Sequence, residues 1–350
     1  MGLRKLGYGL LSLLACCSIV ACGRGNLSVS NGQAGGQSDN CRTIEHDSGQ
    51  TKICDRPEDI ATLGLHSLDL LLSLDREPAG VVTPQPVETD RVEQPEFAIP
   101  TLGERLASQP VALGSFATPA SLEALVQLKP DAIVGEAHRL PSPLLSQIAP
   151  VLPLARRSDT GNWRENLRLS AKMLGNVDLA DAAIADYQAQ LELTRRELAE
   201  TIATHPKVLV LSGDNLTRGI LFALTEQSFV GELLTAVGFE LVVPRGAERN
   251  SVPVSIELLP ELNEADSIVI LGYSIETLRA GASQSDREAF FKSQFEKIRS
   301  DWERNPLAQS LAASQADRVY FQTFYEWNIL NGPIGAELVL RRLRETLGDS

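Results

Sequence analysis

The chain has few of the residues that build catalytic or metal sites. Its 350 residues contain four histidines, His46, His66, His138 and His205, which stand far apart. It has no Gly-x-Ser-x-Gly motif for a nucleophile and no glycine-rich phosphate loop followed by Lys-Ser or Lys-Thr. Hydrolytic and redox chemistry are therefore not expected. One alternative stays open, an envelope metal-ion-binding protein or metalloenzyme that uses His66, His138 and a carboxylate.

Positive charge is also scarce. The 32 Lys and Arg residues are outnumbered by 45 Asp and Glu residues, and the formal net charge is −13. Nucleic-acid binding needs a basic surface, so this class of partner is excluded. The hydrophobic content of 43% over 350 residues is enough to form two cores of ordinary size.

Long apolar runs are absent except at the N-terminus. Arg4 and Lys5 precede an uncharged, mostly apolar run over residues 6–21, which is short for a spanning helix and has the layout of an export signal. The run ends in Ile19-Val20-Ala21-Cys22, which resembles the lipobox of bacterial lipoproteins, where the cysteine becomes the lipid-carrying N-terminus. Cys16 is a second candidate for lipidation. We therefore expect a signal peptide over residues 1–21, a flexible tether over residues 22–40 and a protein anchored to the cell membrane in the periplasm.

Five cysteines are present, and two of them are predicted to pair. Cys16 and Cys17 leave with the signal peptide and Cys22 takes the lipid, so Cys41 and Cys54 remain as an even pair in an oxidising compartment. The residues between them alternate around Asp47-Ser48-Gly49, which is typical of a hairpin. A metal site would need further ligands at useful spacing, so a Cys41–Cys54 disulfide is the prediction.

The remainder of the chain alternates between short apolar strands and amphipathic helices, which predicts parallel α/β sheets. Near the middle, residues 177–204 carry an apolar stripe at helical spacing and would span roughly 40 Å as one helix. We predict an α/β fold of two Rossmann-like lobes with central parallel sheets, joined by one long backbone helix. The predicted boundaries are 41–175 for the N-terminal lobe, 176–205 for the connecting helix and 206–350 for the C-terminal lobe.

The two lobes also repeat in sequence. Residues 121–134 and 255–269 both read Ser-aliphatic-Glu-x-Leu-x-x-Leu, a short turn, and Asp-x-Ile-Val. Residues 67–82 and 228–243 form a second, weaker match in the same order. Two matches on either side of the central helix predict two similar lobes.

Arginine and aromatic side chains follow the predicted strands. In open α/β sheets ligands bind beyond the carboxyl ends of the strands, so these side chains are expected to meet in a cleft between the lobes. Arginines suit anionic oxygen groups, and aromatic rings suit flat or apolar ligand surface. The predicted ligand-binding residues are His66, His138, Arg139, Trp163, Arg218, Arg245, Tyr273, Tyr325 and Trp327.

Over residues 55–347 the chain resembles the helical-backbone class of ABC-transporter solute receptors, which bind ferric siderophores, vitamin B12 or haem. The resemblance is carried by residues 57–64, by residues 121–131 with their Leu-Lys-Pro-Asp segment, by residues 163–167 and by Asn331-Gly332-Pro333-Ile334-Gly335-Ala336. The hairpin closed by Cys41 and Cys54 is similar to one in cyanobacterial iron-siderophore receptors. In this family one glutamate on each lobe docks onto arginines of the permease, and the repeat places Glu123 and Glu257 at equivalent positions.

The expected function is that of a lipid-anchored substrate-binding protein of an ABC importer. It would capture a ferric siderophore and deliver it to a permease dimer in the inner membrane, as a monomer and without catalysis, metal site or cofactor of its own. The alternatives are the same receptor type for vitamin B12 or haem, a metal-binding protein or metalloenzyme that uses His66 and His138, and a lipoprotein that serves as a sensor or scaffold.

Overall fold

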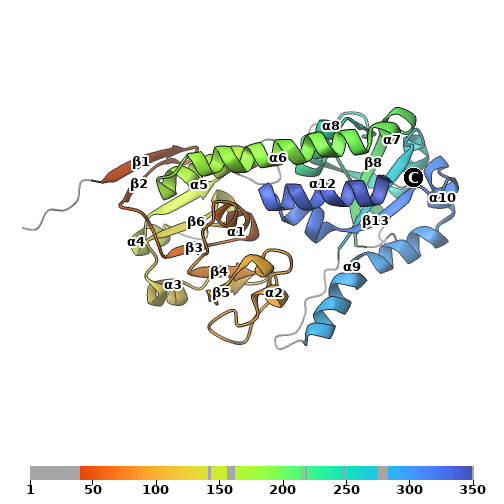
Figure 1. Cartoon of the computed structure of the whole chain (residues 1–350). Helices are drawn as coiled ribbons and strands as arrows, with labels where there is room; N and C mark the ends of the chain where they lie inside the picture. Colours follow the sequence, from red (N-terminus) through yellow and green to blue (C-terminus); the bar gives the residue numbers. More distant parts are fainter. Residues whose placement is uncertain are drawn as a thin grey trace, which may run out of the picture. The chain divides into compact units, whose positions relative to one another are not determined.

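The computed structural model describes residues 40–140, 143–155, 162–214, 216, 219–247, 249–273 and 283–348 (Figure 1). The predicted anchor Cys22 and the predicted ligand residue Arg218 lie outside these residues. The chain divides into two compact units, residues 1–38 and residues 39–350, and every described residue belongs to the second unit. Within the described residues, no helix is both long enough and apolar enough to cross a membrane.

The first lobe contains a five-stranded sheet in which every pairing is parallel, in the order β5-β4-β3-β6-β7. The strands are β3 (Ile60–Thr62), β4 (Gly80–Thr83), β5 (Val111–Ser115), β6 (Ala132–Glu136) and β7 (Val151–Leu154). Helices α1 (Leu65–Leu72) and α5 (Asn162–Leu174) cover one face of the sheet, and α3 (Leu122–Leu128) and α4 (Leu145–Ile148) cover the other. Burial on both faces explains why these strands are apolar throughout, and it confirms the predicted parallel α/β lobe.

The sheet of the second lobe is mixed, which differs from the predicted parallel sheet. Its strands are β8 (Lys207–Gly213), β9 (Ile220–Leu224), β10 (Glu240–Leu241), β11 (Ser251–Ser255), β12 (Ser267–Gly272) and β13 (Val319–Thr323). β9 pairs antiparallel with both β8 and β11, whereas β8, β10, β12 and β13 pair in parallel. Pro253 lies in the middle of β11, and because it has no N–H to donate, a strand containing it is tolerated only at the edge of the sheet.

Helices cover both faces of this second sheet as well. α8 (Phe229–Val237) and α12 (Pro333–Leu347) share one hydrophobic cluster with the first lobe. The other face is covered by η3 (Ile256–Leu262), α9 (Gln284–Arg304), α10 (Pro306–Gln309) and α11 (Ala312–Gln315). Both sheets are therefore central layers, and each has one outer helical layer and one layer that faces the backbone helix.

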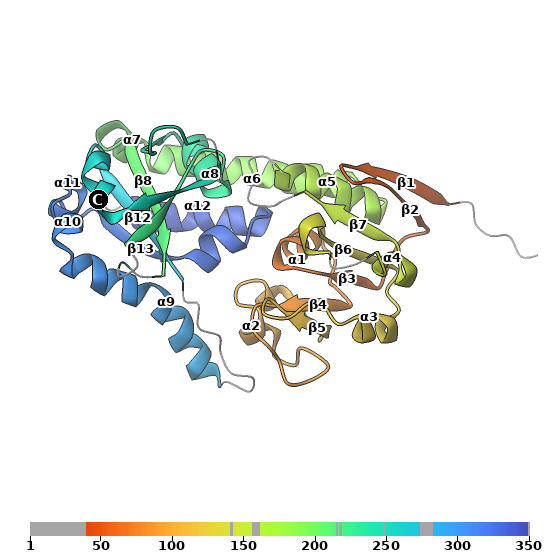
Figure 2. The ribbon, with the colours of Figure 1, turned by 180° about the vertical axis from the view of Figure 1, so that it is seen from behind.

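The backbone helix consists of α6 (Asp178–Glu197) and α7 (Ala199–Thr204), where the sequence predicts one helix. The two meet at Leu198, whose backbone leaves helical geometry while its N–H still donates to Thr194 O at 2.9 Å. Leu198 is fully buried, so the interruption packs into the core. In Figures 1 and 2 α6 runs along both lobes with α12 beside it, and its buried residues Ala180, Tyr187 and Leu191 belong to the shared cluster.

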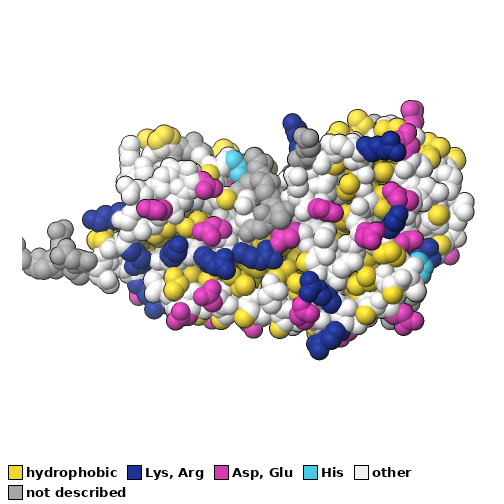
Figure 3. All heavy atoms as spheres, turned by 90° about the horizontal axis from the view of Figure 1, so that it is seen from above, with side chains coloured by type: hydrophobic (Ala, Val, Ile, Leu, Met, Phe, Trp, Pro, Cys, Tyr) yellow, Lys and Arg dark blue, Asp and Glu magenta, His cyan; other side chains and the backbone are white. Residues whose placement is uncertain are grey.

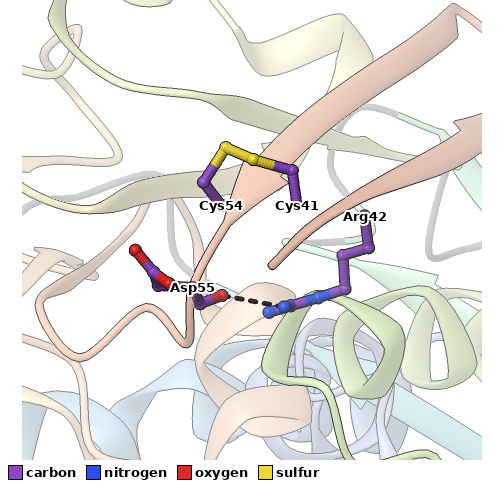
Figure 4. The surroundings of a disulfide bond; sticks show 4 residues. All are labelled: Cys41, Arg42, Cys54 and Asp55. Atoms are coloured by element: carbon purple, nitrogen blue, oxygen red, sulfur yellow. Dashed lines mark hydrogen bonds between the residues drawn. A yellow bond between two sulfur atoms is a disulfide. The ribbon is translucent and has the colours of Figure 1, made fainter. Parts of the chain in front are cut away.

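The N-terminal hairpin has the predicted form. β1 (Cys41–His46) pairs antiparallel with β2 (Gly49–Cys54), and a disulfide joins Cys41 to Cys54 (Figure 4). The Arg42 guanidinium donates to Asp55 O at 2.8 Å, to Lys172 O at 2.8 Å and to Met173 O. The last two carbonyls lie at the C-terminal end of α5, where a cation is favourable. The hairpin is therefore held on the first lobe at the point where the described chain begins.

Residues 84–106 form a strap between the lobes. The strap contains α2 (Pro95–Ala98) and η1 (Gly103–Arg105), and it buries Val92, Ile99 and Leu102 in a cluster with residues of α1 and α12. The Tyr325 hydroxyl at the start of η4 (Tyr325–Ile329) donates to Pro100 O at 3.0 Å. Arg105 also forms an ion pair with Glu337 of α12 at 3.6 Å.

A buried carboxylate joins the first helix of the first lobe to the last helix of the second. Asp69 of α1 accepts hydrogen bonds from the N–H groups of Gly332 (3.2 Å), Ile334 (3.0 Å) and Gly335 (2.9 Å) at the start of α12. These N–H groups have no partner within the helix, and the helix dipole favours a negative charge there. A Cβ atom at position 332 would lie 2.4 Å from Asp69 Oδ1, so the close approach requires glycine.

Burial raises the pKa of Asp69 to about 6, and the three backbone N–H groups and the Ser73 hydroxyl act in the opposite direction. We expect Asp69→Ala to lower the free energy of unfolding by about 2 to 4 kcal/mol at pH 7, because buried donors lose their acceptor. A folded-state pKa above the ordinary 3.8 means that the folded protein binds this proton more tightly than the unfolded chain. The difference in free energy of unfolding between wild type and Asp69→Ala should therefore grow by about 1 kcal/mol when the pH falls from 7 to 5.

Urea unfolding followed by circular dichroism at both pH values measures these differences. Asp186→Ala removes an exposed carboxylate from α6 and serves as the control. Its free energy of unfolding should differ from that of wild type by less than about 0.5 kcal/mol. Equal stability of the two variants at both pH values would contradict the assignment.

Candidate functional site

The carboxyl ends of the parallel strands define the candidate ligand edge of each lobe. In the first sheet the strand order reverses between β3 and β6, which is the position where ligands bind in open α/β sheets. In the second sheet β8, β12 and β13 end on the same edge. The residues that follow these strands decide what the edge can bind.

His66 follows β3, and its position differs from the prediction. It is buried in α1, and its Nε2 lies 2.9 Å from the Asn166 amide nitrogen. The amide orientation is fixed because Asn166 Oδ1 accepts from Ala155 N and its Nδ2 donates to Ala155 O. Nε2 of His66 is therefore an acceptor already in use inside the first lobe, and a ligand role for His66 stays a prediction.

His138 and Arg139 follow β6 in the short helix η2 (Ala137–Arg139). His138 is exposed at the expected edge, whereas the side chain of Arg139 lies outside what the structure describes. Glu136, the last residue of β6, is a buried carboxylate at the same edge that was not predicted from the sequence. A ligand role for His138 and Arg139 stays a prediction.

The two predicted ligand tryptophans are core residues. Trp163 on α5 and Trp327 on η4 are fully buried, and Trp163 packs edge-on against Tyr187 of α6 at 5.1 Å between ring centroids. The Arg164 guanidinium lies 4.5 Å from the centre of the Trp163 ring and forms an ion pair with Glu232 of α8. Their volume fills the core that the two lobes share, and a ligand contact of either tryptophan stays a prediction.

Among the remaining predicted residues, Tyr325 is also nearly buried. Its hydroxyl donates to Pro100 O, and burial raises its pKa above the ordinary value, so Tyr325 takes part in the strap contact, while its ligand role stays a prediction. Tyr273, directly after β12, is half-buried at the edge, with its ring centroid 5.4 Å from that of Phe324. Arg245 is exposed in the turn after β10.

Three exposed apolar residues at the ligand edge were not predicted from the sequence. Phe116 directly follows β5, and Ile220 and Phe222 lie on β9. Because β9 is antiparallel to β8, with Phe222 opposite Ser212, its first residues lie beside the carboxyl end of β8. The run Ile220-Leu221-Phe222-Ala223-Leu224 is entirely apolar and carries no alternation, so the sequence alone does not reveal which side chains stay exposed.

Glu123 and Glu257 occupy equivalent positions, as the repeat predicts. Each is exposed in the first turn of a helix, α3 or η3, that follows a strand and precedes the next parallel strand. The N-cap serine of each helix accepts a backbone N–H, Ser121 from Ala124 at 3.2 Å and Ser255 from Glu257 at 3.4 Å. The structural equivalence is confirmed, while docking through these glutamates stays a prediction.

Basic side chains gather in a row on the first-lobe half of the face that carries α6 (Figure 3). Helix α5 contributes Arg164, Arg168 and Lys172 at intervals of four residues. Arg164 pairs with Glu232, and Arg168 lies 4.0 Å from Asp181. These two arginines hold helices together, α5 with α8 and α5 with α6.

A cavity of about 370 Å³ lies beside the backbone helix, away from the predicted ligand residues. It is lined by the end of α1, by α6 and by the start of α12, with Asp75, Arg105, Asp186 and Glu337 among its polar residues. The described part of the chain contains no cluster of three or more His, Cys, Asp or Glu side chains placed to hold a metal ion.

A family model described as periplasmic binding protein matches residues 60–325, which is most of the chain and includes both sheets. The chain belongs to the periplasmic binding protein family. The helix α6 between two α/β lobes places it in the helical-backbone class of these substrate-binding proteins. The family binds solutes, which agrees with the expectation that the chain is not an enzyme.

This periplasmic binding protein is similar in sequence to two characterised relatives. It is 26% identical over 299 residues to the achromobactin-binding periplasmic protein of Dickeya dadantii (strain 3937), covering 83% of this chain and 87% of that protein. It is 26% identical over 300 residues to the Fe(3+) dicitrate-binding periplasmic protein FecB of Escherichia coli (strain K12), covering 85% of this chain and 87% of that protein.

The fold is shared with solved structures of the same kind. Staphylococcus aureus SirA complexed with staphyloferrin B matches with a TM-score of 0.65 at 21% identity, covering 87% of this chain and 98% of that one. At this identity the match establishes the fold of the periplasmic binding protein and not its ligand.

Proposed function

We propose that this protein is a lipid-anchored receptor of an ABC importer that captures a ferric siderophore in the periplasm and delivers it to a membrane permease. The observation that carries the proposal is the similarity, along more than four fifths of the chain, to relatives that bind achromobactin and ferric dicitrate. A binding role also agrees with the absence of a catalytic constellation among the sequence motifs.

The ligand edge offers two kinds of contact for an iron chelate. Phe116, Ile220, Phe222 and Tyr273 supply apolar and aromatic surface for the organic part of the chelate. Arg245 is the exposed arginine among the predicted residues that the structure describes, and Arg139 and Arg218 complete the set that would neutralise anionic oxygens.

Several contacts join the lobes and would limit a hinge motion between them. One hydrophobic cluster runs from Ile44 of the hairpin to Leu347 of α12, and the lobes are also joined by Asp69 with the start of α12 and by Arg164 with Glu232. Closing or opening the lobes would have to deform these contacts. We therefore infer that ligand capture relies on an edge whose shape changes little.

Titration of residues 39–350 with ferric citrate, ferric hydroxamate and ferric catecholate chelates, and with cyanocobalamin and haemin, tests the ligand class. We expect saturable binding of one ferric chelate at sub-micromolar concentration by isothermal titration calorimetry. Phe222→Ala should weaken that binding by about tenfold, because an aromatic contact at the edge is lost. If the protein binds only cyanocobalamin or haemin, its ligand is vitamin B12 or haem and not a ferric siderophore. Tight binding of only zinc or manganese would refute the proposed receptor function.

The control for this titration is Val177→Ala, which truncates an exposed apolar side chain at the start of α6. Its affinity should stay within twofold of wild type. An equal loss in both variants would mean that Phe222 does not contact the chelate.

Membrane anchoring is proposed to depend on Cys22. In cells that produce the full chain, Cys22→Ser should abolish labelling with radioactive palmitate and move the protein from the membrane fraction to the soluble periplasmic fraction. Cys16→Ser is the matched control and should leave both unchanged. Loss of labelling in the Cys16 variant alone would identify Cys16 as the lipidated residue.

Docking is proposed to use Glu123 and Glu257. In cells of the source organism that carry only the variant gene, Glu123→Arg with Glu257→Arg should abolish uptake of radiolabelled iron supplied as the chelate that binds. The affinity of the purified protein for that chelate should be unchanged, because both side chains are exposed on the outer helical layer.

The matched control places Arg at Glu165 and Glu200, two other exposed glutamates in the first turns of α5 and α7. Uptake should then stay close to that of wild type. Weaker chelate binding by the Glu123/Glu257 variant would show that these glutamates serve the ligand instead of the permease.

A further inference from the structure

The cavity beside the backbone helix is formed by elements of both lobes, by the strap and by the backbone helix itself. Leu72, Ser73 and Asp75 line it where α1 ends, and Arg105 lines it from the strap. The rest of its wall comes from α6 and from the first turns of α12. Its volume of about 370 Å³ lies within the range of about 300 to 1,000 Å³ that is usual for small-molecule sites. None of its lining residues directly follows a strand at the candidate ligand edge, so the cavity is a separate place in the fold.

The charged side chains that line the cavity favour a cation. Asp75, Asp186 and Glu337 are acidic, and Arg105 is the one basic residue among the lining residues. Arg105 already pairs with Glu337 at 3.6 Å. Asp75 and Asp186 form neither an ion pair nor a side-chain hydrogen bond with any described residue. An anion would therefore meet two uncompensated carboxylates, whereas a cation would pair with them.

The spacing of these carboxylates does not suit a metal ion. Three acidic residues line the cavity, yet the described residues include no group of three His, Cys, Asp or Glu side chains placed to hold one ion. The two unpaired carboxylates come from different walls, Asp75 from the end of α1 and Asp186 from α6. Leu72, Ala183 and Ile334 add apolar wall. A ligand with two separated positive charges and a hydrocarbon chain between them matches this lining better than a single ion does.

The cavity also touches the contact that joins the two lobes. Ser73, which lines it, donates through Oγ to Asp69 O at 2.8 Å and lies 3.3 Å from Asp69 Oδ1. Ile334, on the opposite side of that contact, also lines the cavity and donates its N–H to Asp69. These walls come together only in the folded chain. A ligand bound between them would therefore stabilise the folded protein.

We propose that this cavity is a second ligand site and that it takes a small organic dication, a diamine whose two ammonium groups pair with Asp75 and Asp186. The hydrocarbon chain of the diamine would lie against Leu72, Ala183 and Ile334. The inference goes beyond the proposed function, because the site is separate from the ligand edge and its occupant is not an iron chelate.

The test uses 1,4-diaminobutane as the probe, with 1,4-butanediol and succinate as neutral and anionic compounds of the same chain length. In isothermal titration calorimetry with the full chain, we expect saturable one-to-one binding of the diamine with a Kd below about 0.1 mM, and no binding of the other two. The diamine should also raise the thermal midpoint of the protein. Absence of diamine binding, or equal binding of the diol, would overturn the proposal.

Substitutions in the cavity locate the site. Asp75→Asn and Asp186→Asn should each weaken binding of the diamine about fivefold, because each removes one ion pair at an exposed carboxylate. Ala183→Leu adds volume to the wall and should weaken binding at least tenfold. The matched controls are Asp178→Asn and Ala182→Leu, which make the same changes at exposed residues of α6 that do not line the cavity. Their affinities should stay within twofold of wild type.

The controls separate a built site from general attraction to an acidic protein. An equal loss of affinity in Asp178→Asn and Asp186→Asn would show that the diamine binds to the acidic surface at large, and it would overturn the assignment to the cavity. Thermal midpoints measured without the diamine show whether each variant is folded. The titration contains no iron chelate, so a failure of the proposed receptor function leaves its result unchanged.

Discussion

The carboxylate of Asp69 is the contact on which the two-lobed arrangement most depends. It comes from the first helix of one lobe and receives three backbone N–H groups from the first turn of the last helix of the other. Its burial is unfavourable for a charge, and the hydrogen bonds and the dipole of α12 offset that cost. The motif Asn331-Gly332-Pro333-Ile334-Gly335 follows from this geometry, since Gly332 leaves room for the carboxylate and Pro333 begins the helix without needing an N–H partner.

Around this contact the two lobes share one interior, which explains why several predicted ligand residues are buried. The strap brings Ile99 and Leu102 against Tyr325 and Ile334, and Trp163 packs against Tyr187 of the backbone helix. A receptor with a wide hinge motion could not keep such large side chains in the core between its lobes. The aromatic residues near the ends of these strands therefore stabilise the junction, and the proposed ligand contact would fall to smaller exposed sets such as Ile220 and Phe222.

The sequence predicted features that depend on local pattern and missed those that depend on neighbours. The hairpin of Cys41 and Cys54, the parallel first sheet and the equivalence of Glu123 with Glu257 follow from alternation, apolar runs and N-cap serines. The burial of Trp163 and the exposure of Phe222 depend on which helix packs over each side chain, and the spacing of residues in the sequence does not indicate that helix. The antiparallel β11 was missed because Pro253 argues against a strand everywhere except at an edge.

If the permease docks at Glu123 and Glu257 as proposed, the placement of these glutamates limits how docking could act on the ligand. Glu123 and Glu257 lie on the outer helical layers, whereas the contacts that join the lobes lie in the layer on the other side of each sheet. A sheet covered on both faces resists bending, so a force on α3 and η3 moves each lobe as a unit. The part that must yield is the junction itself, where Asp69 meets α12 and Arg164 meets Glu232. The proposed docking would therefore separate the lobes only as far as these two contacts allow, and a ligand would be released through a small change at the carboxyl edges of both sheets.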